Sequence, residues 1–135
     1  MRSRLLACAI LLGVFSIPAA AQTSDAAKVA RGKYLVNNIG MCGDCHTPMD
    51  KKGNPIKAQF LQGGALSFKP AVPIPSWIPV APGIAGLVWT DEEAITFFTT
   101  GKRPNGTMAA PPMPQFRMSK ADAAAVTAYL KTLKP

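Results

Sequence analysis

The sequence predicts a small all-α domain in which three main helices are joined by long loops. Helix start signals followed by apolar residues at helical spacing occur in residues 24–38, 91–100 and 119–133. The sections between these segments hold so many prolines and glycines that neither a helix nor a central strand is expected there. The length of 135 residues suits a single domain.

The first predicted helix spans residues 24–38. Ser24 and Asp25 are both residue types that cap helix N-termini, so either could begin it. Its broken apolar face consists of Val29, Leu35 and Val36. Gly40 is expected to end the helix in a left-handed conformation. We therefore expect an amphipathic helix immediately before the residues discussed below.

The other two helices have clearer signals. Thr90 and Glu93 have the spacing of a capping box, and Gly101 is placed to stop the helix that follows. The buried side of this helix is predicted to be Ala94, Ile95, Phe97 and Phe98. Ser119 opens the last helix, which is expected to run to about residue 133. Its apolar face consists of Ala125, Val126, Tyr129, Leu130 and Leu133.

Residues 47–88 form a long irregular section with seven prolines and five glycines. A loop of this length is unusual in a compact domain unless it wraps around something. Its many apolar residues exclude a disordered linker; they include Phe60, Leu61, Phe68, Ile74, Trp77, Ile78 and Val80.

The motif Cys42-Gly43-Asp44-Cys45-His46 indicates what is wrapped. C-x-x-C-H is the attachment signature of a c-type haem. Two thiols one helical turn apart can add to the two vinyl groups of one porphyrin, while the following imidazole binds the iron. Beyond Cys8, which lies in a segment expected to be removed, the chain has no other cysteine and no other histidine.

Other interpretations of the motif are weaker. A tetrahedral zinc site needs four strong ligands, and the sequence supplies no second Cys/His pair. A thioredoxin-like thiol pair expects alternating strands and helices around it, which the sequence does not predict. A chance C-x-x-C beside a surface histidine is the remaining alternative.

Residues 1–21 resemble a secretory signal peptide, which leaves residues 22–135 as the mature domain. Arg2 and Arg4 precede a 13-residue apolar run, and Ala19-Ala20-Ala21 offers a cleavage site. Thirteen residues are too few to span a bilayer, which needs about 20, so no stable membrane span is expected. Export to the periplasm fits the haem hypothesis, because c-type haem is attached outside the bacterial cytoplasm.

The charge of the chain favours a protein partner. Without Arg2 and Arg4 the lysine and arginine count falls from 15 to 13 against seven acidic residues, a formal net charge of +6. The basic residues are scattered and form no run, so nucleic-acid binding has little support. The positive charge is better explained by the docking of an acidic protein partner.

The second axial position of the iron decides the chemistry. No second histidine exists, so a methionine is the expected ligand, and Met108, Met113 and Met118 compete for the role. Met113 lies between Pro112 and Pro114, which stiffen its loop and reduce the entropy lost on binding. Met118 is next to a helix start and is expected in the core, and Met108 is less constrained. We therefore predict Met113.

The order of these elements resembles the class I cytochrome c fold. The similarity is greatest to single-haem domains in cytochrome subunits of periplasmic sugar, alcohol and aldehyde dehydrogenases, over residues 25–133. The resemblance implies three main helices and long loops wrapped around one covalent haem. It implies Cys42 and Cys45 as thioether anchors, and His46 and Met113 as the iron ligands.

The resemblance implies two further contacts. The first and last helices should cross, which places Tyr34 or Leu35 near Tyr129 and Leu130. In this fold the second nitrogen of the proximal histidine donates to a backbone carbonyl, for which Pro55 is the candidate. This chain departs from the dehydrogenase subunits in having one C-x-x-C-H motif, where those subunits carry three such domains and a membrane anchor.

The sequence therefore predicts an exported electron carrier and not an enzyme. Its partners are expected to be a dehydrogenase and a downstream oxidase or cytochrome. The alternative is a haem peroxidase or gas-binding protein with an open distal site. The apolar, proline-rich loop around Met113 argues against that alternative.

Overall fold

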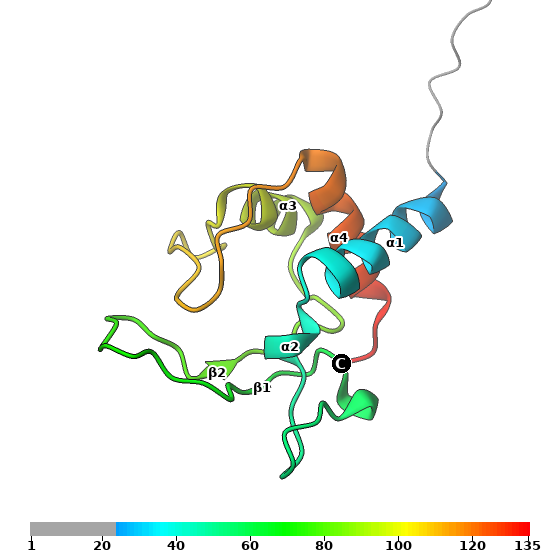
Figure 1. Ribbon diagram of the computed structural model, residues 1–135. Coiled ribbons are helices and arrows are strands. Elements are labelled where there is room, and N and C mark those ends of the chain that lie inside the picture. The colour runs from blue at the N-terminus through cyan, green and yellow to red at the C-terminus, as the bar shows by residue number, and fades with distance from the viewer. Residues whose placement is uncertain (1–23) are drawn as a thin grey trace, which may run out of the picture.

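The computed structural model describes residues 24–135 and is mostly helical (Figure 1). The predicted signal peptide lies outside these residues. The α-helices are α1 (Asp25–Tyr34), α2 (Gly43–His46), α3 (Asp91–Thr100) and α4 (Lys120–Thr132). A small antiparallel sheet pairs β1 (Gly64–Ala65) with β2 (Val80–Ala81). Within residues 24–135 no helix is long and apolar enough to cross a membrane.

The first predicted helix is confirmed and Gly40 lies at its end, but the left-handed conformation predicted for Gly40 is wrong. Ser24 caps α1, its side chain accepting a hydrogen bond from the Ala27 amide, and a π-helical turn over Leu35–Ile39 continues the helix. Gly40 is right-handed, with φ −81°, and the positive φ of 44° falls on Met41 instead. The Gly40 amide bonds to the Leu35 carbonyl at 2.7 Å, so the widened turn ends the helix without a left-handed glycine.

Helices α1 and α4 pack against each other at Gly32. A β-carbon built on Gly32 would lie 1.9 Å from the Ala125 carbonyl oxygen and 2.8 Å from the Tyr129 β-carbon. The missing side chain therefore lets the two helix backbones touch. The Arg31 guanidinium and the Asp122 carboxylate join the same helices at 2.9 Å. As the resemblance implied, Leu35 lies in one buried cluster with Tyr129 and Leu130, whereas Tyr34 is half exposed.

We expect Gly32→Ala to lower the stability of the holoprotein. Alanine is favoured over glycine in a helix by about 1 kcal/mol. Overpacking typically costs about 1–3 kcal/mol, and here the new methyl group would meet backbone, which cannot rotate away. The clash should therefore outweigh the propensity gain, and denaturant unfolding should show a lower midpoint.

The control is Ala30→Val, which adds methyl groups to the exposed side of the same helix. An unchanged or higher midpoint for Gly32→Ala would show that the helices can separate at little cost.

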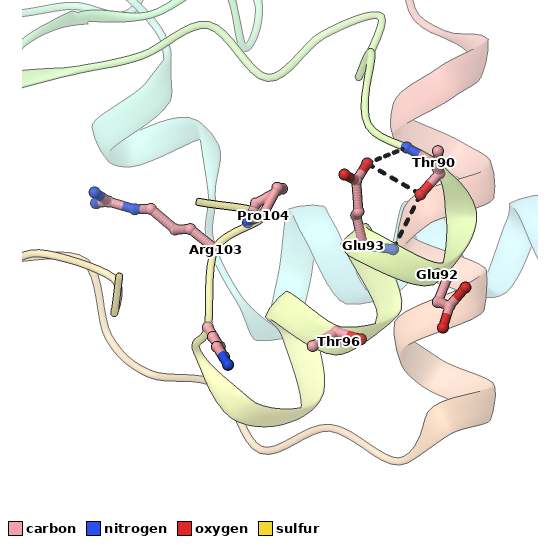
Figure 2. Close-up of a pocket in the computed structure, with 7 residues that line it drawn as sticks. Thr90, Glu92, Glu93, Thr96, Arg103 and Pro104 are labelled. Atoms are coloured by element: carbon pink, nitrogen blue, oxygen red, sulfur yellow. Dashed lines mark hydrogen bonds between the residues drawn. The ribbon is translucent and has the colours of Figure 1, made fainter. Parts of the chain in front are cut away.

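Helix α3 begins and ends where the sequence predicts. The Thr90 hydroxyl accepts a hydrogen bond from the Glu93 amide at 3.2 Å, and the Glu93 carboxylate accepts one from the Thr90 amide at 2.9 Å (Figure 2). Gly101 ends the helix with a left-handed φ of 80°. Lys131 of α4 pairs with Asp91 at the start of α3. An ion pair therefore joins α3 to α4, as the Arg31–Asp122 pair joins α1 to α4.

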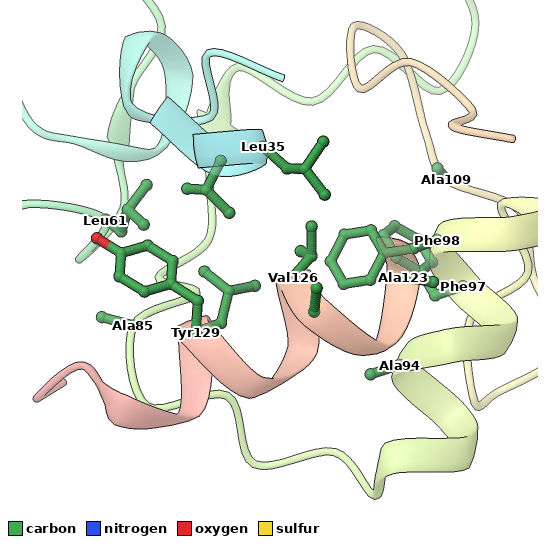
Figure 3. Packing of buried hydrophobic residues seen from close by; sticks show 13 residues of the cluster. Leu35, Leu61, Ala85, Ala94, Phe97, Phe98, Ala109, Ala123, Val126 and Tyr129 are labelled. Carbon is green, nitrogen blue, oxygen red and sulfur yellow. The ribbon is translucent and has the colours of Figure 1, made fainter. Parts of the chain in front are cut away.

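The core lies between these helices, as Figure 3 shows. Side chains from α3 and α4 meet there with Leu35 at the end of α1 and with Leu61 and Ala85 from the long section. The largest fully buried side chains are Leu61, Leu130, Val36, Val126 and Thr127. Helix α4 thus packs against both α1 and α3 and contributes buried side chains to both contacts.

The long section 47–88 is more ordered than the sequence suggests. It contains a 3₁₀ turn over Lys57–Gln59 and the β1–β2 pair, although each strand is only two residues long. Prolines flank β2 on both sides, which explains the short pairing, since proline donates no ladder hydrogen bond. Only the two ends of the segment between the strands stay near the helices, and the remainder projects from the domain (Figure 1).

Candidate functional site

A cavity of about 560 Å³, here called the central cavity, lies among α2, α3, residues 80–89 and the loop around Met113. This volume falls within the range of about 300–1,000 Å³ typical of ligand sites. Its lining is mostly apolar, and it includes all four residues predicted from the sequence: Cys42, Cys45, His46 and Met113. The fold therefore brings together residues from two segments far apart in the chain.

His46 ends α2 and is oriented by a backbone carbonyl. Its side chain is 6% exposed, and Nδ1 lies 2.7 Å from the carbonyl oxygen of Pro82. A carbonyl oxygen can only accept, so Nδ1 carries the proton and Nε2 keeps its lone pair. Burial lowers the pKa of His46, partly offset by the bond to Pro82. The imidazole is therefore neutral near pH 7, which is the form that binds metals.

The prediction that Pro55 supplies this carbonyl is wrong. Pro55 is exposed and forms a bridge with Met49 instead. Pro82 reaches His46 because it follows β2, which β1 holds beside α2. Gly63 makes this approach possible: its φ is 86°, and a β-carbon there would lie 2.6 Å from the Gly83 amide nitrogen. No spacing rule in the sequence links residues this far apart.

The two cysteines flank Gly43 and Asp44 and are both partly buried free thiols. Burial raises the pKa of the Cys42 thiol to about 11, so it is protonated at neutral pH. Gly40 leaves room for this sulfur, because a β-carbon there would lie 3.2 Å from Cys42 Sγ. Gly43 in turn lets α2 pack on the Phe60 ring, 2.9 Å from where its β-carbon would be.

The three candidate methionines differ in position. Met113 is partly buried and lines the central cavity. Its loop is fixed by the bond from its own amide to the Ala110 carbonyl, at 3.0 Å, and by the bond from the Ile78 amide to the Pro111 carbonyl, at 2.9 Å. Met118 packs against the hydrophobic core, as expected, and Met108 is exposed. Neither of these two lines the cavity.

Arg103 is a cavity residue that the sequence reasoning missed. Among the described residues that line the central cavity, Arg103 supplies the only charged side chain. A tight turn presents it: the Arg103 amide bonds to the Thr107 carbonyl at 2.8 Å, and the Gly106 amide bonds to the Arg103 carbonyl at 2.9 Å. The residues Arg-Pro-Asn-Gly are a recognisable turn in the sequence, but nothing in the sequence shows that Arg103 lines the same cavity as His46.

A second cavity of about 420 Å³, here called the polar cavity because most of its lining residues are polar, shares Arg103 with the central cavity. Its lining consists of Thr90, Glu92, Glu93, Thr96, Lys102, Arg103 and Pro104. Figure 2 shows the Arg103 side chain pointing away from the Thr90–Glu93 capping box. Thr90 and Glu93 already bond to each other in the capping box, so their polar groups serve the start of α3 and not a ligand.

The chain is similar to cytochrome subunits of known enzymes. It is 40% identical over 81 residues to the cytochrome c subunit of a quinone-type alcohol dehydrogenase from Gluconobacter oxydans, covering 56% of this chain and 16% of that protein. It is 29% identical over 112 residues to the fructose dehydrogenase cytochrome subunit of Gluconobacter japonicus, covering 76% of this chain and 21% of that one.

A third relative is a dihaem cytochrome c-type protein of Cereibacter sphaeroides. It is 32% identical over 108 residues, which cover 75% of this chain and 34% of the relative. The chain thus spans between 16% and 34% of the length of these relatives. Residues 29–134, which include every residue of the central site, match the family model described as cytochrome c. This match and the site geometry agree: the chain belongs to the cytochrome c family.

Proposed function

We propose that this chain is an exported monohaem cytochrome that transfers single electrons from a periplasmic dehydrogenase toward the respiratory chain. The observation that carries the proposal is the central cavity, where the C-x-x-C-H residues and Met113 line one apolar space. Family membership and the dehydrogenase cytochrome subunits among the relatives support electron transfer and a covalent haem c. The single motif in the sequence supports a count of one.

The residues present fit this cofactor. Cys42 and Cys45 would hold the porphyrin as thioethers, and His46 and Met113 would bind the iron. His46 Nδ1 is committed to Pro82, so its Nε2 is the nitrogen left for a metal. When bound, the haem supplies a one-electron iron couple. The apolar lining excludes water from it, and a thioether ligand favours the reduced state and raises the potential.

Arg103 is the residue suited to a haem propionate. A guanidinium pairs well with carboxylates, and within residues 24–135 no other cation lines the cavity. A cation near the iron favours the ferrous state, which carries one positive charge less. We therefore expect Arg103→Leu to lower the midpoint potential by on the order of tens of millivolts, as one partly screened unit charge would.

Potentiometric titration of the purified holoprotein checks this prediction. Lys102→Leu is the matched control, because Lys102 precedes Arg103 but lines only the polar cavity. A shift for Lys102→Leu as large as that for Arg103→Leu would contradict a local role for the guanidinium.

The proposed function is tested on holoprotein recovered from the periplasm. We expect a reversible one-electron couple, slow and incomplete carbon monoxide binding by the ferrous protein, and electron uptake from a dehydrogenase that weakens with salt. Exposed charges are screened over about 10 Å at 0.1 M salt. The excess of basic over acidic residues is the reason for the salt dependence.

The alternative function, a haem peroxidase or gas-binding protein, is tested in the same experiment. Such proteins use a polar residue beside the distal position, and Arg103 is a charged residue that lines the central cavity. Rapid and complete carbon monoxide binding by the native ferrous protein would favour a peroxidase or gas-binding protein. N-terminal sequencing of the periplasmic protein tests export separately, with Gln22 expected as the first residue.

A further inference from the structure

Residues 66–79, here called the arm, join β1 to β2 and project from the domain (Figure 1). Three apolar side chains of the arm that do not line the central cavity are exposed to solvent: Phe68, Val72 and Ile74, with Val72 at 66%. Single exposed apolar residues are normal, but several on one projecting element indicate an interaction site. The arm is therefore the candidate for a docking surface.

The arm has a defined shape. The Phe68 and Trp77 rings meet edge to face with centroids 5.7 Å apart. The Leu66 amide bonds to the Pro79 carbonyl at 2.9 Å across the base of the arm, and the Trp77 amide bonds to the Ile74 carbonyl at 3.2 Å, which closes a turn on one side. Rigid aromatic residues lose little entropy when a partner covers them, and they dominate many interfaces.

The arm is continuous with the haem site. Leu66 and Ile78 line the central cavity at the base of the arm. The Ile78 amide also donates to the carbonyl of Pro111 at 2.9 Å, in the loop that carries Met113. A partner that covers the arm would therefore lie next to the residues proposed to bind the iron.

Charge indicates the chemistry of that partner. Lys69 is the only charged residue of the arm. Arg103 adds a second cation at the cavity, and none of the described residues that line it is a carboxylate. Asp91 and Asp122 are bound to basic side chains of the helices. The complementary surface is apolar with a border of carboxylates.

Pairing of the arm with a second copy through its backbone is disfavoured. Four prolines in the arm, at positions 70, 73, 75 and 79, remove amide donors, so the arm cannot extend a partner's sheet. A symmetric dimer through the arm would also place Lys69 near its own copy, since a two-fold interface uses the same surface twice.

We propose that the arm docks the redox protein that exchanges electrons with this chain, and that this partner presents an apolar surface bordered by carboxylates. The inference rests on the proposed electron-transfer function. Phe68 and Trp77 are the anchors, and Lys69 faces the acidic border.

The experiment uses holoprotein on gold electrodes coated with a mixed monolayer of methyl- and carboxyl-terminated thiols. We expect Phe68→Ser and Trp77→Ser to weaken binding and interfacial electron transfer about tenfold, as the loss of one interface anchor does. Phe68→Leu should retain most of the binding. Tyr34→Ser is the matched control, because Tyr34 is 49% exposed on α1 and Phe68 is 47% exposed.

Two further measurements make the result specific. On a purely carboxyl-terminated monolayer all variants should bind alike, and in solution ferricyanide should oxidise all of them at the wild-type rate. Equal binding of the variants to the mixed monolayer overturns the docking proposal alone. A wild type that exchanges no electrons even with ferricyanide overturns the proposed function as well.

Other occupants give distinct results. Phe68-dependent binding to phosphatidylglycerol/phosphatidylcholine vesicles, stronger than to the mixed monolayer, would assign the arm to a membrane surface. A dimer that Phe68→Ser dissociates would assign it to a second copy. Either result overturns the proposal of a protein redox partner.

Discussion

Replacement of Cys42 by alanine is expected to leave little mature holoprotein. One of the two thioether bonds is lost, and the porphyrin that would fill the central cavity is no longer held by both sulfurs. Without the porphyrin, the apolar side chains that line the central cavity would face water, and burial of each large apolar side chain contributes about 1.5–3 kcal/mol. Losing several such contributions is comparable with the whole stability of a small domain, about 5–15 kcal/mol.

The yield of covalently attached haem per exported protein measures this effect, and Cys45→Ala should behave in the same way. Asp44→Ala is the control, because Asp44 is exposed between the two cysteines and carries no sulfur. A normally coloured Cys42→Ala protein at full yield would show that the covalent haem assignment is wrong.

Replacement of Met113 by alanine should open the sixth position while His46 and both thioethers stay. The red-region absorption band of iron–sulfur ligation should vanish, and carbon monoxide should bind readily to the ferrous protein. The potential should fall by on the order of 100 mV, within the range of about 0.8 V that axial ligands span. The physical reason is that water or a stray side chain favours the ferrous state less than a thioether does.

Met108→Ala and Met118→Ala are the controls, because neither side chain lines the central cavity. They should keep the band and the potential. A loss of the band in Met108→Ala with retention in Met113→Ala would identify the wrong ligand within the right fold. A wild type without the band would mean that no methionine binds the iron, and the open-site alternative would gain.

The sequence by itself determined the features that depend on neighbouring residues. The capping box at Thr90 and the helix stop at Gly101 depend on residues within a few positions, and the structure has both as predicted; at the first helix it selects Ser24 from the two predicted caps, Ser24 and Asp25. The C-x-x-C-H motif is equally local, because one turn of chain fixes its spacing. The rigid setting of Met113 could be inferred from its flanking prolines in the same way.

Only the tertiary structure decided which distant groups meet. Pro82, not Pro55, reaches His46, because Gly63 lets the two chain segments touch after β1 pairs with β2. Gly32 sets the crossing of α1 and α4 for a similar reason. At each of these glycines, the missing side chain leaves room for a segment far away in the sequence. The residues next to the glycine in the sequence do not indicate which distant segment that will be. The same holds for Arg103 and for the arm: no neighbouring residue indicates that Arg103 lines the central cavity or that residues 66–79 project from the domain (Figure 1).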